Sequence, residues 1–118
     1  MTVRRGDVVI ALFPNADGSG TKPRPVLVVQ ADAYNGRLDN VIVAAITTNL
    51  THATDPASLL IDIGTPEGQA SGLIRNSVVS CVNLATIHGS VVARKIGQLG
   101  PALMSKVDSC LKAALNLP

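Results

Sequence analysis

Short apolar runs separated by turn-forming segments are the feature that most narrows the fold of this chain. Each run is rich in valine, isoleucine, leucine or alanine. It is bounded by glycine, proline or polar residues, which is typical of β-strands joined by loops. The runs predict five strands, at residues 8–13, 25–30, 41–47, 58–63 and 77–82. Short strands at regular spacing favour a small, strongly bent barrel.

The segments between these runs are predicted as polar loops. The first, residues 14–23, is too long and too glycine-rich for a two-residue hairpin turn, and we expect it to be mobile. Residues 64–72 are also predicted as a loop. Residues 84–87 fit either a short sixth strand or a tight helical turn, and the state of residues 90–96 stays open.

The last segment predicts an amphipathic helix that begins at Pro101, since proline is tolerated at the first helical position. Its apolar stripe recurs at helical spacing and contains Leu103, Met104, Val107, Leu111, Ala114 and Leu115. The predicted fold class is therefore mainly β with a C-terminal helix. At 118 residues, the chain is expected to form one domain, residues 1–118.

Composition excludes several classes of protein. Apolar residues make up 47% of the chain and charged residues 15%, which is typical of a globular protein and not of a disordered one. No apolar run approaches the roughly 20 residues that span a bilayer, and no apolar segment follows the N-terminus as in a signal peptide, so we expect a cytoplasmic protein without a membrane partner. The net charge of +2 is too small to predict nucleic-acid binding, so such a claim needs a local site.

Cysteine and carboxylate spacing predicts no metal and no cofactor. Cys81 and Cys110 lie far apart without a CxxC pattern, so both are interpreted as small core residues. The aspartates and the one glutamate are scattered and form no two-metal motif. Aromatic residues are limited to Phe13 and Tyr34, which argues against a module that stacks many bases.

One arginine is held between two prolines just before the second predicted strand. Pro23 and Pro25 keep Arg24 on a stiff, extended backbone. A planar guanidinium on a rigid backbone suits a phosphate group that must be met in a fixed geometry. The third predicted strand ends in Thr47 and Thr48, so a site forms if the two strands are antiparallel neighbours.

Five fragments carry a resemblance to a known family. They are residues 5–9 (Arg-Gly-Asp-Val-Val), 22–29 (Lys-Pro-Arg-Pro and four apolar residues), 43–48 (ending Ile-Thr-Thr), 72–79 (Gly-Leu, then Ser-Val-Val) and 96–99 (Ile-Gly-Gln-Leu). In this order and spacing, they resemble the MazF/PemK toxins of bacterial type II toxin–antitoxin systems. The resemblance implies an SH3-like barrel of the CcdB/MazF type, which is usually a homodimer.

The resemblance also implies an activity: sequence-specific, metal-independent cleavage of single-stranded RNA, with a cognate antitoxin as protein partner. It carries the catalytic pair of the family onto Arg24 and Thr47. The products would be a 2′,3′-cyclic phosphate or 3′-phosphate and a 5′-OH. Rival interpretations are a non-enzymatic gyrase poison of the same fold, which the absence of tryptophan disfavours, and a catalytically silent module that binds RNA or an antitoxin.

Further residues are candidates for binding the RNA. Lys22 attracts phosphate or is simply a solvated charge, and Phe13 stacks on a base or belongs to the core. Asn49 and Asn83 contact bases through their amide groups or have an ordinary turn or cap role. The remaining candidates are Asn15 and Thr48.

The catalytic pair does not include a clear acceptor for the proton of the 2′-hydroxyl, because arginine is a poor general base at neutral pH. His52 and His88 are the only side chains of a type that titrates near pH 7. His52 is interpreted as an exposed loop residue and His88, which precedes Gly89, as a turn residue. Many relatives carry Glu-Gln-Ile-Arg-Thr-Ile-Asp where this chain has residues 82–88, so Ala85 and His88 replace the arginine and the aspartate of that run.

Overall fold

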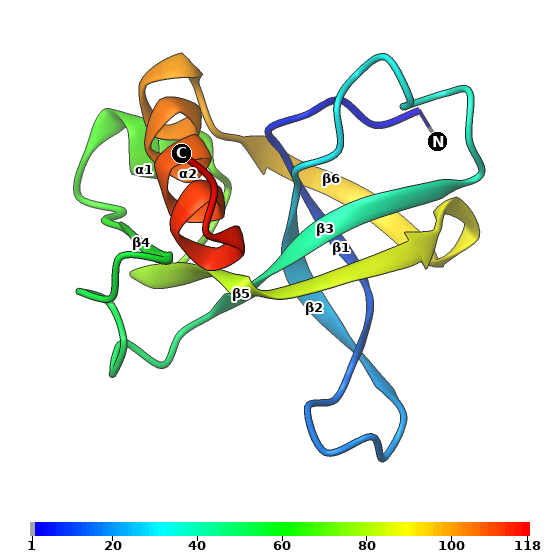
Figure 1. The fold of residues 1–118 in the computed structure, drawn as a ribbon, viewed down its shortest axis with the longest axis horizontal. Coiled ribbons are helices and arrows are strands. Elements are labelled where there is room, and N and C mark those ends of the chain that lie inside the picture. The colour runs from blue at the N-terminus through cyan, green and yellow to red at the C-terminus, as the bar shows by residue number, and fades with distance from the viewer. Residues whose placement is uncertain (1) are drawn as a thin grey trace.

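Six antiparallel strands form one sheet in a computed structural model that describes residues 2–118 (Figure 1). The elements are β1 (Asp7–Pro14), β2 (Thr21–Val28), β3 (Asn40–Thr47), β4 (Ser58–Ile61), α1 (Pro66–Ala70), β5 (Ser77–His88), the 3-10 turn η1 (Gly89–Val91), β6 (Val92–Gln98) and α2 (Pro101–Leu115). The order across the sheet is β4-β5-β3-β2-β1-β6. The prediction of a mainly β fold with a C-terminal helix is confirmed.

The boundaries differ from the predictions where backbone pairing extends or interrupts an apolar run. β2 begins at Thr21, inside the predicted first loop, because residues 21–24 pair with β1 despite their polar character. Residues 84–87 belong to β5 and are neither a separate strand nor a helical turn. The predicted loop at residues 64–72 contains the short helix α1, capped by the Thr65 side chain.

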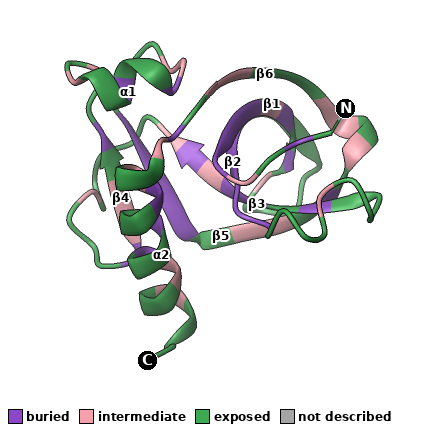
Figure 2. Cartoon of the chain, turned by 90° about the horizontal axis from the view of Figure 1, so that it is seen from above, coloured by how far each residue is buried: buried purple, intermediate pink, exposed green. Residues whose placement is uncertain are grey.

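Both faces of the central strands are buried, which explains their nearly continuous apolar sequences. Val8, Leu27 and Ala44 belong to a core on the side of α2, whereas their neighbours Val9 and Val26 belong to a second core inside the curled sheet. Figure 2 shows the buried strands β1 and β2 within the curl, with α2 on the outside. One face of the central strands therefore packs against α2, and the other face packs against residues inside the curled sheet.

Helix α2 covers one of these cores through Met104, Val107 and Cys110, which are buried. Leu115, predicted to continue the apolar stripe, is 54% exposed, because the helix extends past the sheet at its end. An ion pair between Arg5 Nη2 and Asp108 Oδ1 (2.6 Å) links the helix to the N-terminal segment. No helix within residues 2–118 is long and apolar enough to cross a membrane.

The two cysteines are free and buried, as predicted for core residues. Burial, with a smaller contribution from Cys110, raises the pKa of the Cys81 thiol to about 12. Burial also raises the pKa of Cys110. A thiol reacts through its thiolate, so neither side chain is poised for chemistry at neutral pH.

Two glycines are required by close contacts between backbone segments. Gly72 has a φ of +75° and lies against the backbone of β6, and Gly97 lies against the backbone of Ser71. A Cβ atom at either position would overlap those backbone atoms. The chain between α1 and β5 therefore crosses β6 at a distance that only glycine allows.

A bulge bends β5 beside β3. The pairing shifts from Ala44 with Leu84 to Ala45 with Ser80, so that residues 81–83 have no partner in β3. Bulges bend a strand and redirect its side chains. The first half of β5 consequently pairs with β4 and the end of β3, and the second half pairs with the beginning of β3.

Candidate functional site

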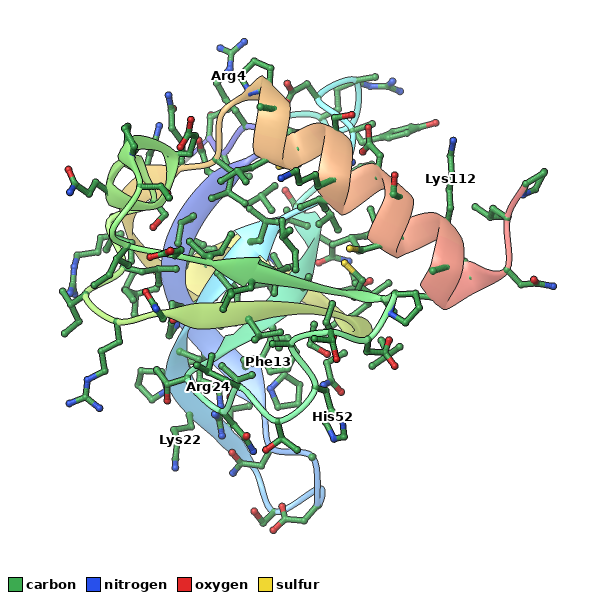
Figure 3. The ribbon with its side chains drawn as sticks, turned by 90° about the vertical axis from the view of Figure 1, so that its left-hand side faces the viewer. Arg4, Phe13, Lys22, Arg24, His52 and Lys112 are labelled. Carbon is green, nitrogen blue, oxygen red and sulfur yellow. The ribbon has the colours of Figure 1, made fainter. Side chains whose placement is uncertain are left out.

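A cavity of about 310 Å³ opens where β3 ends. Its lining comes from β1, β2, β3, β4, β5 and the loops after β1 and β3. It contains Phe13, Pro14, Ala16, Arg24, Ala45, Ile46, Thr47, Asn49, His52, Ser58, Val78, Ser80 and Asn83. Figure 3 shows Phe13, Arg24 and His52 on the same side of the molecule, on the opposite side from α2.

The pairing between β2 and β3 ends beside the cavity. Their antiparallel pairing covers only Val26 to Val28 on β2 and stops before Pro25. If the register continued, Arg24 would lie opposite Thr47. Proline has no N–H with which to donate to a third strand, so Pro23 and Pro25 suit a segment that pairs with β1 alone.

Arg24 is half-buried in the wall of this cavity and keeps most of its donors free. Its one hydrogen bond to another side chain is long, with Nη2 donating to Asn15 Oδ1 at 3.4 Å. Within residues 2–118, no carboxylate lies within ion-pair distance of Arg24, whereas Arg5 is paired with Asp108. A guanidinium without a carboxylate partner is available to bind an anion.

Thr47 presents a hydroxyl whose proton is free. Its Oγ1 accepts a hydrogen bond from the Asn49 backbone N–H at 3.1 Å, which uses a lone pair and leaves the O–H as a donor. Asn49 Oδ1 in turn accepts from the N–H (3.0 Å) and the hydroxyl (2.6 Å) of Thr51. These contacts hold the chain in a tight turn directly after β3.

His52 is the functional candidate that the sequence interpretation did not include in the site. It is exposed, as expected of a loop residue, but it also lines the cavity. The turn at Asn49 and Thr51 carries the loop back over the end of β3. The Asn-x-Thr spacing, which allows an asparagine side chain to bond the backbone two residues on, is the sequence signal that could have revealed this.

The bulge in β5 brings Asn83 into the same lining. Asn83 Nδ2 donates to Ser80 Oγ at 3.0 Å, which leaves the amide oxygen of Asn83 open to a ligand. Phe13 is only 8% exposed and belongs to the inner core while also lining the cavity. Both interpretations of Phe13 therefore remain compatible with its position.

Three predicted residues lie outside the lining. Asn15 contacts Arg24 and donates through Nδ2 to Ser19 Oγ (3.2 Å), so it lies beside the guanidinium. Lys22 and Thr48 are exposed and do not line the cavity. Figure 3 shows Lys22 farther out, toward the hairpin that joins β1 and β2.

The loop after β1 is closed by its own hydrogen bonds. Asn15 N–H donates to Gly20 O at 2.8 Å, and Gly18 N–H donates to Asn15 O at 3.0 Å. Ser19, through its side chain and its backbone N–H, lowers the pKa of the exposed Asp17 carboxyl. The mobility predicted for this loop stays a prediction.

The charge of the cavity favours an anionic ligand. Arg24 lines it, and no aspartate or glutamate among residues 2–118 does. Groups of three or more histidine, cysteine or acidic side chains that could hold a metal ion do not occur in the described part of the chain. The arrangement provides a guanidinium fork, a hydroxyl donor and an imidazole around one space, which matches the needs of a phosphodiester.

Comparison with known proteins gives one consistent result. The family described as PemK-like, MazF-like toxin of type II toxin-antitoxin system matches residues 4–115. The chain is 36% identical to endoribonuclease EndoA of Bacillus subtilis, over 99% of this chain and 97% of that protein. It is 34% identical to endoribonuclease MazF6 of Mycobacterium tuberculosis, over 99% of this chain and 100% of that protein.

Solved structures agree with the sequence relatives. An endoribonuclease in complex with its cognate antitoxin, from a mycobacterial species, superimposes with a TM-score of 0.76 and 26% identity. The match covers 98% of this chain and 97% of that one. The predicted barrel of the MazF type is thereby confirmed.

Proposed function

The chain belongs to the PemK-like, MazF-like toxin family, and on that basis we propose that it is a sequence-specific endoribonuclease toxin that cleaves single-stranded RNA, in particular mRNA, without a metal ion. The relatives at 34–36% identity over nearly the whole chain are endoribonucleases. One observation on this chain carries the proposal: Arg24 and Thr47, distant in sequence, line one cavity that has no acidic lining residue among residues 2–118.

Arg24 is the group proposed to stabilise the transition state. Cleavage by the neighbouring 2′-hydroxyl passes through a pentavalent phosphorus with added negative charge on its non-bridging oxygens. A guanidinium can donate two parallel hydrogen bonds to those oxygens. Its half-buried position reduces competition from water, which makes its donors more effective than those of the same group in free solution.

Thr47 is proposed to hold the same phosphate in line. Its hydroxyl proton is free because Oγ1 accepts from the Asn49 N–H. Holding the scissile phosphate in a fixed position converts cleavage into a well-oriented intramolecular reaction. Asn49 and Asn83 offer amide groups at the rim of the cavity, and we propose that these contact bases of the RNA.

The partners follow from the family. A mycobacterial relative has been solved with its cognate antitoxin. We propose that this chain also binds a cognate antitoxin, that it forms a homodimer, and that it acts in the cytoplasm, where mRNA is found. Lys22, exposed beside the cavity, is proposed to attract the RNA backbone without contacting the scissile phosphate.

Incubation of the purified protein with a mixed-sequence single-stranded RNA in EDTA tests this function. We expect cleavage at defined sites, with 5′-OH and cyclic phosphate or 3′-phosphate ends, loss of cleavage in Arg24→Ala and clearly slower cleavage in Thr47→Ala. Cleavage that requires added Mg²⁺ would contradict the metal-independent mechanism. No cleavage by the wild type would favour a silent binding module or a non-enzymatic toxin, and a gyrase supercoiling assay would separate these.

A further inference from the structure

The cavity holds one side chain of the type that exchanges protons near neutral pH. Arginine stays protonated in proteins, and threonine, serine and asparagine do not titrate in the working range. Among the lining residues, His52 is the one imidazole, and no carboxylate within residues 2–118 competes for the role. Among the described residues that line the cavity, His52 is therefore the one candidate for proton transfer to or from the reacting oxygens.

The backbone that carries His52 is fixed to the backbone that carries Thr47. Thr47 Oγ1 accepts from Asn49 N–H, and Asn49 Oδ1 accepts from Thr51, the residue before His52. On the other side, the carbonyl of His52 accepts from Asp55 N–H at 3.1 Å. These hydrogen bonds thus fix the backbone of His52 relative to the hydroxyl that is proposed to hold the phosphate.

The imidazole of His52 is also free to bind a ligand. Across residues 2–118, neither of its ring nitrogens takes part in a hydrogen bond or an ion pair, unlike those of His88, where Nδ1 accepts from Ser90 N–H at 3.1 Å. Two charged groups belong to its surroundings: Arg24 on β2, which lines the same cavity, and Asp55 in its own loop, whose Oδ1 accepts from Ala57 N–H. The linings from β1, β4 and β5 are uncharged.

We propose that His52, as the imidazolium, donates the proton to the leaving 5′-oxygen; this rests on the proposed ribonuclease function. The 2′-oxygen forms a bond to phosphorus while its proton passes to a water molecule, and the bond from phosphorus to the 5′-oxygen breaks. The ring proton of His52 goes to that 5′-oxygen. The products are a 2′,3′-cyclic phosphate and a 5′-OH, and neutral His52 recovers a proton from the hydronium ion.

The leaving group is where a proton is needed most. A 5′-alkoxide is a stronger base than the 2′-alkoxide that attacks. Departure of the 5′-oxygen without a proton therefore costs more free energy than removal of the proton from the 2′-hydroxyl. Water reaches the open cavity and can accept the 2′ proton. Positioned general acids contribute about 10²–10⁴-fold to rate, which sets the size of the expected effect.

A sulfur substitution in the substrate tests this role directly. The RNA is an oligonucleotide cut by the wild-type protein at a mapped linkage, made in a second form with sulfur in place of the 5′-oxygen of that linkage. A thiolate leaves without a proton. We expect His52→Ala and His52→Gln to lower the rate on the oxygen substrate by about 10²-fold or more, and to lower it less than about tenfold on the sulfur substrate.

Matched variants separate this role from a structural one. Arg24→Ala should be slow on both substrates, and His88→Ala should match the wild type on both. Equal losses on both substrates, or no loss on the oxygen substrate, in a His52→Ala protein with wild-type circular dichroism and melting temperature, would overturn the role of His52. If the wild type cuts no RNA, the proposed function fails, and the role of His52 fails with it.

Discussion

Two cavities of nearly equal size lie near opposite ends of β3, and the difference between them shows what makes a site. The cavity at the end of β3 has a volume of about 310 Å³ and contains His52, Asn49 and Ser80. The cavity at the beginning of β3 has a volume of about 300 Å³ and contains His88, Asn40 and Ser90. Each lining therefore contains a histidine, an asparagine and a serine.

Their hydrogen bonds and charges differ. In the second cavity, His88 accepts from Ser90, and Asn35 bonds with the side chain and carbonyl of Gln30 and with Asp32. An acidic residue, Asp39, lines it. The first cavity has an arginine without a carboxylate partner in the described chain and a threonine with a free proton. Polar groups that are satisfied by each other support the fold, and those left open can bind a ligand.

The largest expected effect comes from removal of the cationic group that distinguishes the first cavity. Arg24→Ala should lower kcat/KM for RNA by about 10²–10³-fold or more, because donors aimed at developing charge contribute on this scale. Arg24→Lys keeps the charge but loses the planar fork, so it should recover only part of the rate. Cleavage rates on a mapped oligonucleotide measure both. An Arg24→Ala protein with wild-type activity would remove the distinction between the cavities.

A smaller loss is expected at Thr47. Thr47→Val keeps the shape and removes one hydrogen bond to the anionic phosphate, which corresponds to about 1.5–3 kcal/mol and hence about 10- to 160-fold in rate. It also leaves the Asn49 N–H without its acceptor. Thr47→Ser should stay close to the wild type. Single-turnover kinetics on the three proteins make this comparison, and a serine variant as slow as the valine variant would argue against a role for the hydroxyl.

Lys22 should affect binding and not chemistry, because it is exposed outside the lining. Lys22→Ala should weaken RNA binding at low salt and leave the single-turnover rate at saturating protein unchanged. The slope of log K against log salt should fall in magnitude by about 0.7, the value for one phosphate contact on a single strand. Binding titrations at several salt concentrations measure the slope, and an unchanged slope would show that Lys22 makes no phosphate contact.

The smallest effect on activity is expected in the second cavity. Asn35→Ala removes hydrogen bonds with Gln30 and Asp32, so it should lower the free energy of unfolding by about 1–3 kcal/mol, and RNA cleavage below the melting temperature should match the wild type. Denaturant unfolding and cleavage assays on one preparation test both halves. Strong loss of cleavage in this folded variant would show that the two cavities are coupled.

Much of the fold was predictable because burial leaves a local signature. Five strands and the C-terminal helix followed from apolar runs and a helical stripe, and Arg24 stood out because its flanking prolines restrict its backbone. The extension of β2 to Thr21 was missed, since those residues are polar and are held by pairing with β1. The exposure of Leu115 was also missed, because periodicity does not show where a helix extends beyond its sheet.

By itself, the sequence determined the order of the first five strands, the C-terminal helix and the presence of an arginine on a rigid backbone. Only the tertiary structure decided that pairing between β2 and β3 ends before Arg24, that a bulge in β5 places Asn83 at the same cavity, and that His52 lies there while His88 lies at the other one. The physical reason is that strand periodicity is a local property, whereas register, bulges and loop direction depend on pairing between segments far apart in the chain.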